Sequence, residues 1–159
     1  MNKIYFTRGH KIIEIISYVL LAVSFILAII AQKTLPDQIP AHYDLTGKVT
    51  GYGSPTTLFM LPGIMLFSNL IISFVTHFVS TDFWSMPFKV KEERKIIVYR
   101  DIVSLMLWIE LEIAAFTLIF TIMSYIQKMA GAFVLTILLM VLFAVTIIVF
   151  CILAAKHNR

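Results

Sequence analysis

The chain has 159 residues, of which 60% are hydrophobic and only 14% charged, and it carries a formal net charge of +4. This composition excludes an ordinary water-soluble domain, because a fold of this length could not hide so much apolar surface from water. Because the chain has no soluble domain that could carry a nucleic-acid-binding surface, we expect no nucleic-acid partner. The sequence predicts one membrane domain over residues 1–159.

Four apolar blocks are long enough to cross a membrane as helices, since roughly 30 Å of hydrocarbon takes about 20 residues. They cover residues 12–32, 57–79, 102–125 and 132–155. The first block exceeds the apolar core of a signal peptide, about 7 to 15 residues, and lacks a small-residue cleavage site, so we read it as a retained anchor. We therefore predict an all-α polytopic membrane protein with four transmembrane helices.

Basic residues predict the orientation, because short cytoplasmic segments carry the excess of Lys and Arg. If the N-terminus is inside, ten of the thirteen basic residues are cytoplasmic: Lys3, Arg8, Lys11, Lys89, Lys91, Arg94, Lys95, Arg100, Lys156 and Arg159. Only Lys33, Lys48 and Lys128 then lie outside. We expect both termini in the cytoplasm, with the basic residues near anionic lipid head groups.

Segment 33–56, between the first two helices, is predicted to be an ordered extracellular loop with some hairpin character. Prolines fix extended backbone and glycines permit turns, while apolar side chains anchor the loop on the helix ends. The prolines and glycines are Pro36, Pro40, Gly47, Gly51 and Gly53, and the anchors are Ile39, Tyr43, Val49 and Tyr52.

In an extended stretch His42 and Asp44 point the same way, and three interpretations of the pair are open. Asp44 could cap a turn that His42 orients. The loop could instead recognise an extracellular partner, because ordered loops frequently carry function, with Asp37, Tyr43 and Tyr52 as further candidate binding residues. A metal site of His42, Asp44 and Asp37 is the third, but no cysteine or second histidine supports it, and we predict no metal.

The cytoplasmic segment 80–101 has helical periodicity and mixed charges from Val90 or Lys91 onward. We therefore expect the third transmembrane helix to begin early and to emerge into the cytoplasm. The extension is either a solvated, lipid-contacting helix or a docking site for a cytoplasmic protein. The sequence does not separate these two interpretations.

Glu110 and Glu112 fall near the middle of the third helix, where a charged carboxylate costs at least a few kcal/mol. Residues two apart on a helix are separated by about 200°, so we expect one glutamate to face lipid in its protonated form. Asn69 is the best polar partner at that depth and could donate to either carboxyl group. Nearer the cytoplasm, Arg100 and Lys11 could reach His77 and Glu14. The glutamates are either structural contacts between helices or a site linked to a proton or ligand.

The outer loop reads Leu35-Pro36-Asp37-Gln38-Ile39-Pro40-Ala41-His42-Tyr43-Asp44 and is followed by Gly47, Gly51, Tyr52, Gly53 and Ser54. This pattern resembles the bacterial proteins of the domain of unknown function 1648, a membrane domain also found in SdpI-like immunity proteins. Pro62, the Pro87 to Val90 stretch, Tyr99 and Leu107 with the glutamates after it also resemble the family. Two positions depart from it: Pro55 stands where Lys is common, and Asp44 where Asn is common. The additional helices of the larger SdpI-like proteins are lacking.

The resemblance implies a protein of the bacterial cytoplasmic membrane that protects its producer against a secreted peptide toxin, by binding the toxin or blocking its action. His42, Tyr43 and Asp44 would then form the recognition surface. The competing hypothesis is a small transporter or ligand sensor that uses Glu110, Glu112 and Asn69. No H-E-x-x-H or G-x-S-x-G motif is present, so we expect no enzyme and no cofactor. Besides the lipid bilayer, the expected partner is a peptide or small ligand, and a homo-oligomer is possible.

Overall fold

The computed structural model describes residues 2–44, 46–129 and 131–159, so Leu45 of the predicted loop lies outside the described residues. The helices are α1 (Arg8–Thr34), α2 (Met60–Phe78), α3 (Lys95–Tyr125) and α4 (Ala132–His157), and the strands are β1 (Ile39–Tyr43) and β2 (Val49–Gly53). Short 3-10 helices cover Asn2–Tyr5, Pro55–Phe59, Thr81–Phe83 and Glu92–Arg94. Within the described residues, four helices are long and apolar enough to cross a membrane. The predicted all-α polytopic fold is confirmed.

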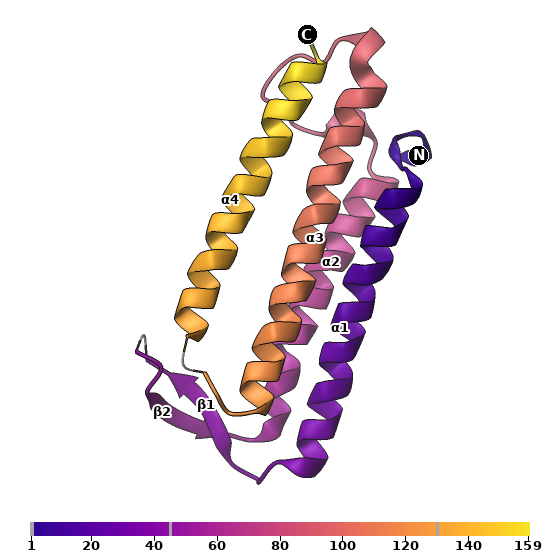
Figure 1. Cartoon of the computed structure of the whole chain (residues 1–159). Helices are drawn as coiled ribbons and strands as arrows, with labels where there is room; N and C mark the ends of the chain where they lie inside the picture. Colours follow the sequence, from indigo (N-terminus) through magenta and orange to yellow (C-terminus); the bar gives the residue numbers. More distant parts are fainter. Residues whose placement is uncertain (1, 45, 130) are drawn as a thin grey trace.

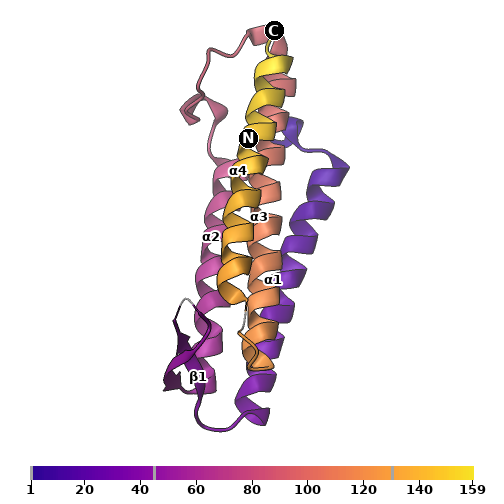
Figure 2. The same cartoon turned by 60° about the vertical axis from the view of Figure 1, so that its left-hand side comes forward.

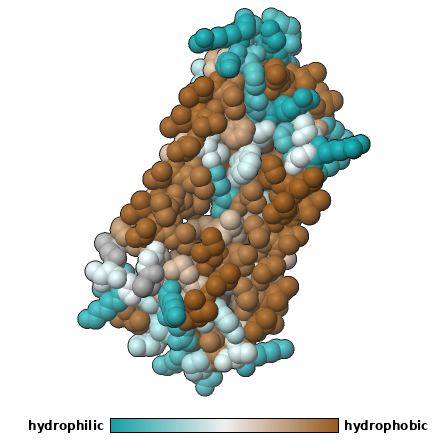
Figure 3. Space-filling model, in the orientation of Figure 1, coloured by the Kyte–Doolittle hydropathy of each residue, from teal (hydrophilic) through white to brown (hydrophobic). Residues whose placement is uncertain are grey.

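The four helices run side by side as a bundle, with both chain termini at one end and the β1–β2 hairpin at the other (Figures 1 and 2). We call these the terminal end and the hairpin end. Hydrophobic residues cover the middle of the molecule and hydrophilic residues gather at its two ends (Figure 3). Such an exposed apolar band is costly in water but suits a bilayer, where it meets lipid chains. The chain is a multi-pass membrane protein.

Helix α3 is the centre of the bundle, because it packs against α1, α2 and α4, whereas α4 packs mainly on α3. Twelve buried residues belong to α3, and only two, Thr146 and Ala154, belong to α4. Figure 1 shows α4 lying along one side of α3, apart from α1 and α2. Most of α4 is therefore left for contact with lipid.

The segment before α3 differs from its predicted form. The early start of the helix is confirmed, because α3 begins before the apolar block 102–125, but it begins at Lys95, directly after the 3-10 helix Glu92–Arg94, and not at Val90 or Lys91. The preceding stretch is held instead against the C-terminus, because Asn158 accepts a hydrogen bond from the Lys91 amide (2.9 Å) and donates one to the Lys89 carbonyl (3.0 Å). Met86 and Val90 also pack on the core there. Tertiary contacts therefore override the local helical periodicity.

Candidate functional site

The β1–β2 hairpin confirms that the loop predicted between the first two helices is ordered and has hairpin character. The strands are antiparallel, with His42 opposite Gly51, and an irregularity in the register lies on each side of His42. In the turn, Asp44 Oδ1 accepts hydrogen bonds from the Thr46 hydroxyl (2.6 Å), the Thr46 amide (2.9 Å) and the Lys48 amide (3.0 Å). The Thr46 hydroxyl, followed by the Lys48 amide, lowers the pKa of Asp44. Asp44 thus acts as the predicted turn cap.

His42 does not take part in this turn cap. His42 and Asp44 are both exposed, but they are not hydrogen-bonded to each other. The imidazole lies across β2, since a Cβ atom on Gly51 would be only 3.0 Å from His42 Cδ2. The His42 ring can therefore pack over β2 at this point because Gly51 has no side chain.

A cleft of about 350 Å³ lies beneath the hairpin, between β1, the start of α2 and the end of α3. Its walls are mainly apolar: Pro40, Ala41, Leu58, Met60, Leu61, Phe120 and Met129, with polar atoms from His42, Tyr43, Thr57, Thr121 and Ser124. The Tyr43 hydroxyl donates to the Pro40 carbonyl (3.2 Å), and burial raises the pKa of Tyr43.

The cleft takes in only two of the five predicted loop residues, His42 and Tyr43. Asp37 precedes β1 and is exposed, and Tyr52 lies opposite Pro40 with 66% of its surface exposed. Within the described residues, no three His, Cys, Asp or Glu side chains lie close enough to hold a metal ion. The structure therefore does not gather Asp37, His42 and Asp44 into a metal site.

Glu110 and Asn69 meet in the middle of the bundle, but not as predicted. Glu110 is 15 residues from each end of α3 (110 − 95 and 125 − 110), and both side chains are 0% exposed. The Asn69 amide donates to the main-chain carbonyl of Glu110 (3.2 Å) and not to its carboxyl group. Both carboxyl oxygens of Glu110 and Asn69 Oδ1 lack a hydrogen-bond partner among the residues that the structure describes.

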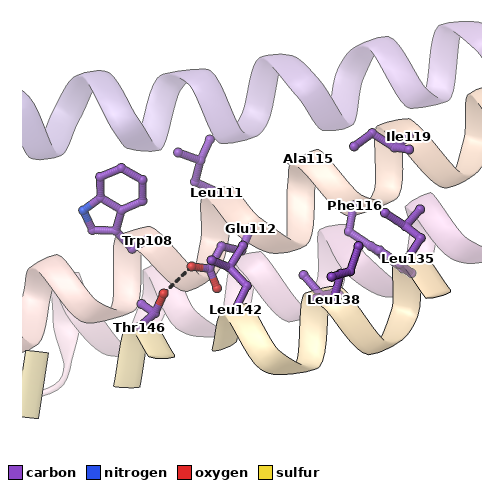
Figure 4. A pocket seen from close by; sticks show the side chains of 11 residues that line it. Trp108, Leu111, Glu112, Ala115, Phe116, Ile119, Leu135, Leu138, Leu142 and Thr146 are labelled. Atoms are coloured by element: carbon purple, nitrogen blue, oxygen red, sulfur yellow. Dashed lines mark hydrogen bonds between the residues drawn. The ribbon is translucent and has the colours of Figure 1, made fainter. Parts of the chain in front are cut away.

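Glu112 points to the opposite side of α3, where Thr146 of α4 donates a hydrogen bond to Glu112 Oε1 (Figure 4). The expectation that one glutamate faces lipid is wrong, because Glu112 is only 7% exposed. The reason is the central position of α3, which has a neighbouring helix on each side. Glu112 borders an apolar pocket of about 440 Å³ between α3 and α4, into which Trp108, Phe116 and several leucines project (Figure 4).

A third polar cluster joins α1 and α2 nearer the terminal end. Glu14 Oε1 contacts His77 Nε2 (2.8 Å) and accepts a hydrogen bond from the Ser73 hydroxyl (2.9 Å). The His77 ring stacks on Phe6, with ring centroids 4.3 Å apart. The predicted partners Lys11 and Arg100 are not in this cluster; Glu14 and His77 pair with each other. The four-residue spacing of Asn69, Ser73 and His77 was the signal available in the sequence.

Comparison with known proteins places residues 19–66 in the family described as "Domain of unknown function (DUF1648)". The match covers most of α1, the hairpin and the start of α2, so the predicted resemblance is confirmed there. No curated protein and no solved structure matches the chain. The hairpin thus lies inside the matched segment, whereas Asn69, Glu110 and Glu112 lie outside it.

Proposed function

We propose that this chain, whose residues 19–66 belong to the domain of unknown function 1648, is a bacterial immunity protein of the SdpI-like type. In this role it binds a secreted peptide toxin at the hairpin end and so protects the producing cell. The observation that carries the proposal is the cleft beneath the hairpin. Its volume, about 350 Å³, falls within the range of about 300 to 1,000 Å³ of ligand pockets.

The chemistry of the cleft suits an apolar segment of a peptide. Apolar side chains form most of its lining, while His42 and Tyr43 supply polar atoms from β1. Such a combination buries apolar groups and leaves a few polar groups to orient a ligand. The cleft also lies at the hairpin end of the bundle, between β1 and the ends of α2 and α3, where a peptide that arrives from that side of the membrane would meet it.

The proposed orientation places the hairpin end outside the cell and both termini in the cytoplasm. It is supported by the basic residues, of which ten belong to segments at the terminal end and three, Lys33, Lys48 and Lys128, to segments at the hairpin end. This distribution follows the excess of Lys and Arg in cytoplasmic segments. A toxin that arrives from outside then meets the cleft directly.

Expression of the chain in a strain that is sensitive to such a toxin tests the proposal. The native chain should restore growth, and His42→Ala should reduce the protection at equal expression. Thr50→Ala is the matched control, because Thr50 is exposed on the hairpin and is not part of the cleft lining. Unchanged killing by every peptide tried would contradict immunity. Equal protection by the two variants would remove His42 from the recognition surface.

A further inference from the structure

A line of polar side chains leads from the terminal end into the middle of the bundle. Asn69, Ser73 and His77 are four residues apart and therefore share one face of α2. Glu14 and Tyr18, also four residues apart, lie on α1. The two helices are joined along this line, since Ser73 and His77 both contact Glu14 Oε1 at 2.9 and 2.8 Å.

The outer part of this line is open to the surroundings. The His77 side chain is 33% exposed and the Glu14 side chain 17% exposed. An imidazole and a carboxyl group in direct contact, here 2.8 Å apart, can pass a proton between them through their hydrogen bond. The Glu14–His77 pair is therefore suited to take protons from the terminal end.

The inner part of the line ends at Glu110. Asn69 lies one turn beyond Ser73 on α2 and donates to the main-chain carbonyl of Glu110 (3.2 Å). Tyr18 lies one turn further into the bundle than Glu14 on α1, and its hydroxyl is buried and, like the two carboxyl oxygens of Glu110, has no hydrogen-bond partner among the described residues. The line of polar side chains on α2 thus reaches the fully buried Glu110.

Among the residues that the structure describes, no Lys or Arg lies at the depth of Glu110 in any of the four helices. The titratable groups that face it are Glu14 and Tyr18 from α1; α2 contributes Asn69, which is neutral, and His77 beyond Glu14. Helix α4 lies on the other side of α3, at Glu112. An unpaired carboxylate is unfavourable in such a place, so Glu110 is expected to hold a proton there.

We propose that Glu110 is a proton-binding site that exchanges its proton with the terminal end of the bundle, along the line of Asn69, Ser73 and the Glu14–His77 pair. The site is separate from the cleft beneath the hairpin and does not depend on the proposed immunity function. In the orientation proposed above, the proton comes from the cytoplasm.

Exchange is confined to one side because the path does not continue toward the hairpin end. Among the described residues, the buried polar side chains there are Ser24 on α1 and Thr117 and Thr121 on α3. Each donates its hydroxyl to a main-chain carbonyl of its own helix, at 3.0, 2.7 and 2.7 Å. Unlike Ser73, which donates to Glu14 of another helix, none of the three hydroxyls bonds across to a neighbouring helix, so they do not continue the line.

Infrared difference spectroscopy of the protein in lipid nanodiscs, recorded as a function of pH, tests the site. The native protein should show the carbonyl band of a buried carboxylic acid, with an intensity that depends on pH. The band should be lost in Glu110→Gln and kept in Glu112→Gln, the matched control on the opposite face of α3. If Glu110→Gln does not fold, Glu110→Asp serves as the second variant. It keeps a carboxylic acid at this position and should shift the pH at which the intensity of the band changes.

The path is tested by the rate at which the intensity of the same band changes after a pH jump. Ser73→Ala should slow the change several-fold, while Ser68→Ala should leave it unchanged, because Ser68 donates to Ile64 of its own helix (3.1 Å) and lies outside the line. A band whose pH-dependent intensity is the same in Glu110→Gln as in the native protein, or a band that does not respond to pH, overturns the proposal. Equal rates in the two serine variants overturn the path. A band that responds to Na⁺ at constant pH assigns the site to a metal cation instead.

Discussion

Replacement of Thr146 by valine should loosen α4 from the bundle. Valine keeps the shape of threonine but cannot donate to Glu112 Oε1, and the other carboxyl oxygen already lacks a partner among the described residues. A hydrogen bond between membrane helices contributes on average about 0.6 kcal/mol and at most about 1.7 kcal/mol. Because the variant leaves the buried carboxyl group of Glu112 with no partner, we expect a loss near the upper value, about 1.5 kcal/mol.

The stability of this variant can be measured by titration with a denaturing detergent in mixed micelles, followed by tryptophan fluorescence. Trp108 lines the same pocket as Glu112 and Thr146 and therefore reports on α4. Thr136→Val is the matched control on α4, since the Thr136 hydroxyl donates to the Ala132 carbonyl of its own helix (2.9 Å). A Thr146→Val variant as stable as Thr136→Val would refute the role of Glu112 in holding α4.

Three further predictions concern the centre of the bundle and the hairpin. Asn69→Leu should leave stability unchanged or raise it by about 1 kcal/mol in the same detergent titration. The reason is that the change removes one hydrogen bond together with a buried oxygen that lacks a partner among the described residues. A clear loss of stability would contradict this. Gly51→Val should displace the His42 ring, 3.0 Å from the added Cβ, and reduce protection in the growth assay as much as His42→Ala does. The lowered pKa of Asp44 means that its turn cap stabilises the hairpin above the ordinary carboxyl pKa and is lost as the pH falls through the lowered value. The Lys48 amide resonance should therefore shift with pH in the native chain but not in Asp44→Asn.

The transmembrane helices were predictable from the sequence because the bilayer imposes both a length and an apolar composition on them. The predicted block 132–155 differs from α4, Ala132–His157, by only two residues at its end. The hairpin was also predictable in outline, since prolines restrict the backbone to extended conformations and glycines at short spacing permit turns. These features depend on neighbouring residues and on the solvent, and not on how the helices pack together.

The contacts inside the bundle could not be predicted, because they depend on the order of the helices and on the rotation of each about its axis. Glu112 is buried only because α4 packs on the side of α3 opposite to α1 and α2. Glu14 and His77 are 63 residues apart, and nothing local indicates that they meet. Asn69 was correctly placed beside Glu110, but depth alone does not tell a main-chain carbonyl from a carboxyl group.

The two intramembrane glutamates are only two residues apart, but they differ in how far hydrogen bonds offset the desolvation of their carboxyl groups. Glu112 binds α4 through Thr146, and its desolvation is partly offset by that contact. Glu110 is buried more completely, yet the nearby amide of Asn69 donates to its main chain and leaves its carboxyl oxygens unpaired among the described residues. A purely structural role would be filled at lower cost by an apolar residue of similar size. The carboxyl group of Glu110 is therefore better explained by binding a proton than by holding helices together.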